Sequence, residues 1–301
     1  MEKLGVVSNI WAKRLSAGDR FEDLLLRFGK EGFSDIEIRD GDYLRNSEFG
    51  VFLNEIERIS EPYPAAAWKG VCEALSSGGI SAEAIRPTDR PFFERIRRFK
   101  EKTSGITLTY ALQHPWMSRP DDVEENDRRI ISAKKLAFLL SPSFARMRLV
   151  DLSSSKPIDV SVASANLDRY CSLASELPVI HAVENSHESA LLTLKIATEA
   201  GFFIAYDEAN LFLPGDLIIE APELFWESLD PRSLVSVHLK QKSADGVLPH
   251  LGPGRVDLSG IMSRVRKIAF TGDVLLESAA SENPLEAAKM SRDYISGLTG
   301  A

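Results

Sequence analysis

The chain has 301 residues, of which 44% are hydrophobic and 27% are charged, and its formal net charge is −8. This composition is typical of a globular protein, and the acidic balance argues against a protein that binds nucleic-acid phosphates, because such proteins carry a basic surface. The two cysteines, Cys72 and Cys171, lie far apart in the sequence, which favours a reducing compartment over a disulfide framework.

The first residues, MEKLGVVSNIW, lack a basic segment followed by a long apolar one, as a signal peptide would have. No window of the sequence holds 18 consecutive apolar residues, the length that a membrane-spanning helix needs. We therefore expect a cytoplasmic protein that has neither a membrane nor a nucleic acid as a partner.

Short apolar segments rich in β-branched residues alternate with segments of helical periodicity. The first strand is expected at residues 4–10, and the helix after it has one apolar face formed by Phe21, Leu24, Leu25 and Phe28. Seven further strands are expected, at residues 34–40, 105–113, 145–152, 178–185, 202–210, 234–240 and 272–278.

Alternation of strands and helices predicts a parallel sheet, because parallel neighbours need a crossover connection. Eight such units predict an α/β protein with the (β/α)8 TIM-barrel fold, as a single domain over residues 1–301. The alternative is an open doubly wound sheet. That fold normally carries a glycine-rich fingerprint after its first strand, and the segment SNIWAKRLSAGD has none.

One part of the sequence, residues 41–104, interrupts this alternation of strands and helices. It contains no convincing strand but has helical patterns around residues 52–59, 65–75 and 91–100. A structureless loop of this length inside a compact domain is improbable. We therefore expect an enlarged crossover between the second and third strands, whose role as lid, subunit contact or packing element the sequence leaves open.

Four consecutive strands each end on a potential metal ligand. In a TIM barrel these carboxyl-terminal strand ends line one site. A single carboxylate there often caps the next helix, and a lone histidine is often structural. Three carboxylates together would repel one another, and a divalent cation would remove that cost. The set is rich in hard oxygen donors, which favours Mn²⁺ or Mg²⁺, with Co²⁺ or Zn²⁺ as alternatives. The four residues are Glu184, Asp207, His238 and Glu277.

The motifs around these residues carry a resemblance to a known family. VEN, DEAN, VHLK followed by LGPGRVDLSGI, and GDVLLES occur in this order between residues 179 and 278. They resemble the xylose isomerase-like TIM-barrel superfamily, the sugar phosphate isomerase/epimerase family, and GFSDIEIR is similar to the family's second strand. The resemblance implies that the four residues bind one divalent metal ion. It also implies that Glu184 and Glu277 face opposite sides of the substrate as catalytic acid and base.

The activity implied is that of an isomerase or epimerase in carbohydrate metabolism, acting on a small keto-sugar or sugar derivative. The metal would bind a carbonyl oxygen and the adjacent hydroxyl and stabilise the enediolate that forms on loss of the α-proton. A dehydratase or other lyase on the same scaffold, or a non-catalytic sugar-binding barrel, remains an alternative. An apurinic-site endonuclease is disfavoured, since its three-zinc site needs more histidines than the five present. Homodimers and homotetramers are common in this family.

Candidate substrate-binding residues surround the expected metal site. They are Asn210, which stands where many family members have histidine, and His187, Lys240, His114 and Trp116. Gln241 replaces an aspartate common after the VHLK motif.

Three expectations concern residues beside the site. The loop that starts at Gly252 and ends at Gly254 is expected to approach the site closely, and Asp257 to cap the next helix. Glu37 and Arg39 are expected on opposite faces of the second strand, so that at most one faces the barrel interior.

Overall fold

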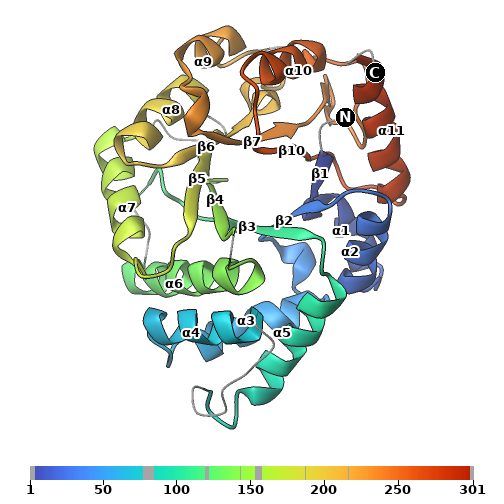
Figure 1. Ribbon diagram of the computed structural model, residues 1–301. Helices are drawn as coiled ribbons and strands as arrows, with labels where there is room; N and C mark the ends of the chain where they lie inside the picture. Colours follow the sequence, from blue (N-terminus) through green and yellow to red (C-terminus); the bar gives the residue numbers. More distant parts are fainter. Residues whose placement is uncertain are drawn as a thin grey trace.

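The computed structural model describes residues 4–76, 85–118, 122–142, 144–152, 158–186, 188–215 and 217–298. Within these ranges, eight parallel strands close into a barrel in the order β1-β10-β7-β6-β5-β4-β3-β2 (Figure 1). The predicted TIM barrel is confirmed, and the open doubly wound sheet is wrong. The strands are β1 (Leu4–Val7), β2 (Asp35–Arg39), β3 (Thr107–Gln113), β4 (Arg146–Val150), β5 (Ile180–Glu184), β6 (Phe203–Asp207), β7 (Leu234–Leu239) and β10 (Asp273–Leu276).

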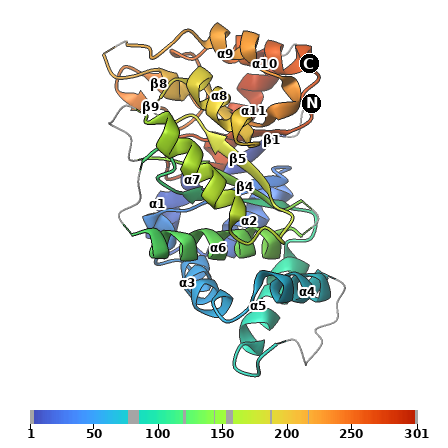
Figure 2. The same ribbon diagram turned by 90° about the vertical axis from the view of Figure 1, so that its left-hand side faces the viewer.

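Helices surround the barrel on its outside (Figures 1 and 2). A two-stranded hairpin of β8 (Lys242–Ser243) and β9 (Gly246–Val247) follows β7. No helix of the described ranges has both the length and the apolar character needed to cross a membrane. The helices are α1 (Ala12–Ser16), α2 (Phe21–Lys30), α3 (Glu48–Ser60), α4 (Ala65–Ser76), α5 (Arg90–Lys102), α6 (Val123–Leu140), α7 (Val160–Ser172), α8 (Ala190–Glu199), α9 (Pro222–Ser228), α10 (Leu258–Lys267) and α11 (Pro284–Leu298).

The sequence patterns correspond to these elements for simple packing reasons. All residues of β1 are buried, as expected for a strand with the barrel interior on one face and helices on the other. In α2 the buried residues are the four of the predicted apolar face, Phe21, Leu24, Leu25 and Phe28. The strands are shorter than the apolar segments that predicted them, because the outermost residues of each segment belong to the loops.

The enlarged crossover between β2 and β3 is confirmed, and the α-helices in its described part are α3, α4 and α5. Two of these helices, α3 and α4, lie beside α6 and extend the molecule away from the barrel (Figures 1 and 2). The buried amino group of Lys135 on α6 donates hydrogen bonds to the carbonyl oxygens of Ser60 and Tyr63. The Trp68 indole donates in turn to the Lys135 carbonyl at 2.8 Å.

The neighbouring residue Lys134 likewise donates hydrogen bonds to backbone carbonyls, in this case those at the end of α7. Its amino group is buried and donates to the carbonyl oxygens of Tyr170 and Leu173 at 2.6 Å each, at the carboxyl end of that helix. Burial lowers the pKa of each of the two lysines, Lys134 and Lys135, to about 8. Lys134 and Lys135 of α6 thus connect this helix to α7 and to the end of α3, respectively.

Candidate metal centre

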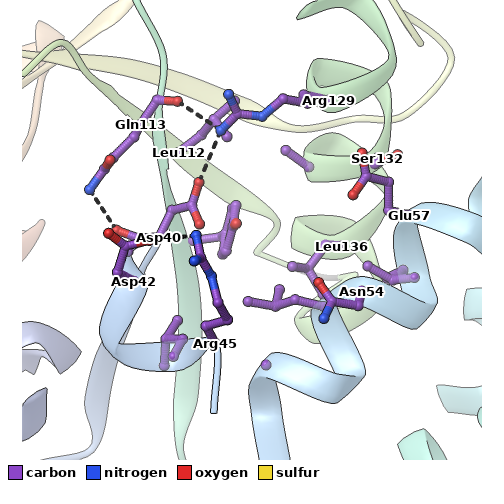
Figure 3. A pocket seen from close by; sticks show the side chains of 17 residues that line it. Asp40, Asp42, Arg45, Asn54, Glu57, Leu112, Gln113, Arg129, Ser132 and Leu136 are labelled. Atoms are coloured by element: carbon purple, nitrogen blue, oxygen red, sulfur yellow. Dashed lines mark hydrogen bonds and ion pairs between the residues drawn. The ribbon is translucent and has the colours of Figure 1, made fainter. Parts of the chain in front are cut away.

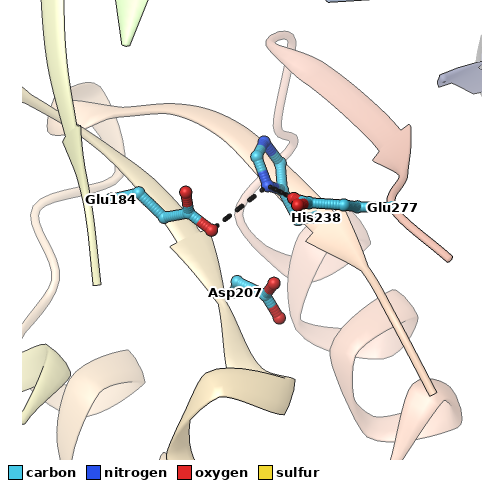
Figure 4. A group of neighbouring side chains, drawn as sticks. All are labelled: Glu184, Asp207, His238 and Glu277. Atoms are coloured by element: carbon cyan, nitrogen blue, oxygen red, sulfur yellow. Dashed lines mark ion pairs between the residues drawn. The ribbon is translucent and has the colours of Figure 1, made fainter. Parts of the chain in front are cut away.

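The four predicted ligands come together at one end of the barrel. Each of them offers one donor atom, and these atoms lie within 4.8 Å of one another. Figure 4 shows Glu184 and Glu277 approaching from opposite sides, with Asp207 and His238 between them. All four side chains are almost fully buried.

The strand register accounts for this convergence. Asp207 pairs with His238 across β6 and β7, and the Glu277 amide donates to the Leu239 carbonyl at 3.1 Å. Glu184 ends β5, beside β6. Parallel strands present their carboxyl ends at one edge, so four neighbouring strands place these residues in one layer.

Within the cluster, His238 is the residue that contacts both glutamates. Its Nδ1 lies 2.8 Å from Glu277 Oε2 and 3.6 Å from Glu184 Oε1. Four buried atoms of the cluster have charged neighbours but make no well-directed hydrogen bond within the described residues: Asp207 Oδ2, Glu277 Oε2 and both ring nitrogens of His238. Buried polar atoms normally make hydrogen bonds. These atoms are the kind of hard oxygen and imidazole donors that divalent cations bind, so the side chains fit a metal ion.

Each carboxylate of the cluster uses one oxygen for a fixed protein contact and turns the other towards its neighbours. Asp207 Oδ1 accepts from the Ala209 amide at 2.9 Å, and Glu277 Oε1 accepts from Arg39 Nη1 at 2.6 Å. Glu184 Oε2 pairs with Arg148 Nη1, while its Oε1 faces His238 and accepts from Asn210 at 3.2 Å. The orientation of each ligand is therefore set by the protein.

Three cations surround the cluster, and sequence reasoning did not place two of them there. Arg148 on β4 pairs with Glu184, and its Nε and Nη2 lie 3.0 and 2.5 Å from Glu37 Oε1. Arg39 contacts Glu277. Lys240 Nζ lies 2.6 Å from Asp207 Oδ2 and 3.6 Å from Glu277 Oε1. These cations compensate part of the negative charge of the carboxylates, so a metal ion is not the only source of compensation.

The expectation for Glu37 and Arg39 is wrong. Both side chains reach the barrel interior, where Glu37 contacts Arg148 and Arg39 contacts Glu277. The physical reason is the strand period of two, which places residues i and i+2 on the same face. This spacing is the signal that could have placed Arg39 beside the ligands.

The charges around the cluster shift two carboxyl pKa values. Burial alone would raise the pKa of Glu277, but Lys240, Arg39 and His238 hold it well below its usual value. Burial likewise acts to raise the pKa of Glu37, but the charges of Arg148 and His238 and the hydrogen bond from Arg148 together outweigh it and lower the pKa. Both carboxyls are therefore ionised at neutral pH.

Two asparagines organise the ends of β5 and β6. The Asn185 side chain donates to the Asp207 carbonyl at 2.8 Å and accepts from the Asp207 amide at 2.9 Å. Asn210 donates to Glu184 and to the Asn185 carbonyl, and its Oδ1 lies 3.4 Å from Lys240 Nζ. Asn210 and Lys240, both predicted substrate-binding residues, thus lie directly against the ligand set.

The loop after β7 is held by Gln241. Its amide donates to the carbonyls of Gly252 and Val256 at 2.9 and 3.2 Å and accepts from two backbone amides. A Cβ atom at Gly254 would lie 2.4 Å from the Gln241 side chain, so any other residue here would displace Gln241. Asp257 accepts from the Gly260 amide at 2.9 Å, which confirms the predicted cap of α10.

The other candidates lie at different places. His114, after β3, is 4% exposed, and burial lowers its pKa to about 4. Trp116 is fully buried in the hydrophobic core. His187 lies outside the described residues. For these three residues a role in substrate binding stays a prediction.

A separate cavity of about 460 Å³ lies outside the barrel, between α3, α6 and the ends of β2 and β3 (Figure 3). Arg129 on α6 is directed towards Asp40 and the Gln113 carbonyl there, at 3.4 and 3.5 Å. Burial raises the pKa of Asp40. None of the four ligand residues lines this cavity.

Comparison with known proteins gives structural matches only. No protein-family model matches the chain, and no curated protein matches its sequence. Among solved structures, it is similar to a xylose isomerase domain containing protein from Salmonella typhimurium LT2, with a TM-score of 0.62, 13% identity, and coverage of 99% of this chain and 97% of that one. The IolI protein with a bound zinc atom gives a TM-score of 0.64 at 13% identity, with 99% and 98% covered.

A third similar structure is D-psicose 3-epimerase with D-tagatose from Clostridium cellulolyticum H10, at a TM-score of 0.59 and 14% identity, with 97% of this chain and 99% of that one covered. These likenesses extend over nearly the whole chain, including residues 1–150, where only the spacing of the strands and the segment GFSDIEIR indicated a resemblance. The chain therefore has the fold of the xylose isomerase-like TIM barrels, as the resemblance of its sequence motifs predicted.

Proposed function

We propose that this protein is a divalent-metal-dependent isomerase or epimerase of a small keto-sugar or sugar derivative. The observation that carries the proposal is the meeting of Glu184, Asp207, His238 and Glu277 at the carboxyl ends of neighbouring strands, with donor atoms within 4.8 Å. In a TIM barrel this end is where active sites form. Similar folds in sugar epimerases add support.

Glu184 and Glu277 are the proposed proton-transfer pair. They belong to strands separated by β6 and β7, so they flank Asp207 and His238 from two sides. One carboxylate removes the proton next to a carbonyl, and the other returns a proton. Return to the opposite face of the same carbon gives an epimer, and return to the neighbouring carbon gives an isomer.

The four ligand residues would hold the metal ion, which would stabilise the negative charge of the enediolate. Their hard donor set favours Mn²⁺ or Mg²⁺. Asn210 keeps Glu184 Oε1 oriented through its 3.2 Å hydrogen bond and has a carbonyl oxygen near Lys240. We propose that Asn210 and Lys240 also contact substrate oxygens.

The test begins with metal binding. Protein stripped with a chelator is titrated with Mn²⁺, and bound metal is measured by elemental analysis for the wild type, Glu277→Gln and His238→Ala. We expect about one ion per chain in the wild type and at least about tenfold weaker binding in both variants, because each removes a ligand. Glu223→Gln, which removes an exposed carboxylate paired with Arg264, is the matched control and keeps the metal.

Loaded protein is then incubated with keto-sugars in heavy water, and deuterium incorporation is followed by NMR. Exchange at the carbon next to the carbonyl, absent in Glu277→Gln, supports the proposal. Loss of water from the sugar would instead identify a dehydratase. Failure to bind Mn²⁺, Mg²⁺, Co²⁺ or Zn²⁺ would contradict the proposal and favour a non-catalytic barrel.

A further inference from the structure

We infer that the substrate carries a carboxylate directly next to its reacting carbons, and that Arg39 and Lys240 bind this group. The inference rests on the proposed metal-dependent function and adds the charge and the position of the substrate's anionic group. Two features carry it: the balance of buried charges around the ligand set, and the contacts of the two cations with that set.

The charge balance changes sign when a divalent ion binds. Two sets of buried charges lie on either side of His238. Arg148 pairs with Glu37 and Glu184, and Arg39 and Lys240 pair with Glu277 and Asp207. With His238 neutral, as a metal ligand must be, the two sets together carry one net negative charge. A divalent ion makes it one net positive charge. A buried net charge is costly, and a substrate with one negative charge removes it.

Arg39 has an unused donor at this place. Its side chain is 17% exposed, its Nη1 contacts Glu277 Oε1 at 2.6 Å, and its buried Nε finds no acceptor within the described residues. A buried donor of a charged group without an acceptor is unfavourable. A guanidinium binds a carboxylate through two N–H groups, so a ligand carboxylate beside Glu277 would satisfy Nε.

Lys240 lies where a metal ion competes with it. Its ammonium group is 2.6 Å from Asp207 Oδ2, the oxygen of Asp207 that is not occupied by the Ala209 amide. Because like charges repel, a metal ion held by Asp207 would weaken the contact of this residue with Lys240. The ammonium group is then available to an anion, and Asn210 Oδ1, 3.4 Å away, stays beside it.

The position of the two cations sets the position of the anionic group. Arg39 and Lys240 both flank Glu277 Oε1, at 2.6 and 3.6 Å, so they lie against the ligand set itself. A carboxylate bound by these two cations would be attached to a carbon adjacent to the carbons that take part in the proposed reaction, which are the carbonyl carbon and the carbon that exchanges its proton. A phosphate at the far end of a sugar chain is several bonds away and does not reach it. The substrate class is therefore a keto-sugar acid.

Three probes with the same carbon skeleton test this inference. Binding of 2-keto-D-gluconate, D-fructose and D-fructose 6-phosphate to Mn²⁺-loaded protein is measured by calorimetry, after metal content has been determined separately. The first probe differs from fructose by a carboxylate next to the carbonyl, and the third carries its charge at the far end. We expect 2-keto-D-gluconate to bind at least about tenfold more tightly than either other probe, as one charge-assisted contact provides. Metal-free protein should show no such preference.

Variants separate ligand binding from a merely structural role. Arg39→Gln and Lys240→Met should abolish the preference, while Lys240→Met keeps or strengthens Mn²⁺ binding because a competing cation is gone. Arg39→Lys should retain part of the preference. Lys242→Met is the matched control, since its amino group is turned to the Phe212 carbonyl at 2.9 Å, and it should keep the preference.

Two results overturn the inference while the proposed function stands. In both, the protein binds metal and exchanges the protons of keto-sugars. It then either binds the three probes with equal affinity or binds D-fructose 6-phosphate most tightly. Loss of Mn²⁺ binding in Lys240→Met would also overturn it, because that residue would then only support the ligands. Wild-type protein that binds no metal overturns both proposals, and the separate metal measurement identifies that case.

Discussion

Arg148 connects Glu37 on β2 to Glu184 on β5 inside the barrel, and its guanidinium is almost completely buried. The interior of a TIM barrel is usually filled by branched apolar side chains. Here the layer next to the ligand set is instead ionic, and each ion in it depends on the others for compensation.

The first prediction concerns this ionic layer. Arg148→Met leaves Glu37 buried without its cation, so we expect the free energy of unfolding to fall by about 3–5 kcal/mol, measured by urea denaturation. Arg148→Met also takes the cation from Glu184, so the double variant with Glu37→Leu removes one of two stranded charges and should recover part of this loss. Equal stability of the single and double variants would show that Glu37 is not held as an ion by Arg148.

The second prediction concerns the Asn185 side chain, which makes two hydrogen bonds to the Asp207 backbone. Asn185→Ala should loosen Asp207 and weaken Mn²⁺ binding by about 10–100-fold, as loss of a supporting residue does in other metal sites. Asn166→Ala is the control, because that amide bonds the backbone of Trp116 and Ser118 away from the ligands. If both variants weaken metal binding equally, the effect is one of general stability.

The third prediction concerns Gly254, whose added Cβ would lie 2.4 Å from the Gln241 amide. Gly254→Ala should displace Gln241 from its loop contacts and lower the free energy of unfolding by about 1–3 kcal/mol, a usual cost of overpacking. The same substitution should cost much less in a Gln241→Ala background, because the two residues contact each other. Additive effects of the two changes would contradict this explanation.

The fourth prediction concerns acid stability. Burial lowers the pKa of His181 to about 3, and its ring packs between Tyr170 and Phe202 at 4.9 and 5.7 Å. The unfolded chain takes up a proton near pH 6.5 and the folded chain does not, so stability is full above that pH and falls as the pH drops towards 3. His181→Phe should reduce this fall by about 1.4 kcal/mol per pH unit between pH 6 and 4. Denaturant titrations at several pH values measure it, and an unchanged slope would contradict a neutral, half-buried imidazole at this position.

The sequence predicted the barrel and the convergence of the four candidate ligands because both depend on local patterns. Apolar strands and helical periodicity recur along the chain, and Glu184, Asp207, His238 and Glu277 stand at strand ends, where the chain order alone brings them together. The three helices of the crossover were predictable from their own periodicity for the same reason.

The ionic layer could not be predicted in this way. The strand that holds Arg148 also holds Arg146, whose partners are Asp273 and the Val235 carbonyl. Arginine in a strand usually points to solvent, and its burial depends on partners from distant strands that only the closed barrel brings near. Arg39 differs, since the strand period places it on the same face as Glu37.

Lys135 has a consequence for any shortened form of the chain. Its ammonium group depends on carbonyls at the end of α3 and just beyond, inside the enlarged crossover. Deleting that crossover would remove both carbonyl acceptors of the Lys135 ammonium group and leave this charge on α6 without them. The adjacent residue Lys134 would still be needed, because it donates hydrogen bonds to the end of α7. The crossover is therefore not a removable module. A minimal barrel made from this chain needs an apolar residue at position 135 in the same step.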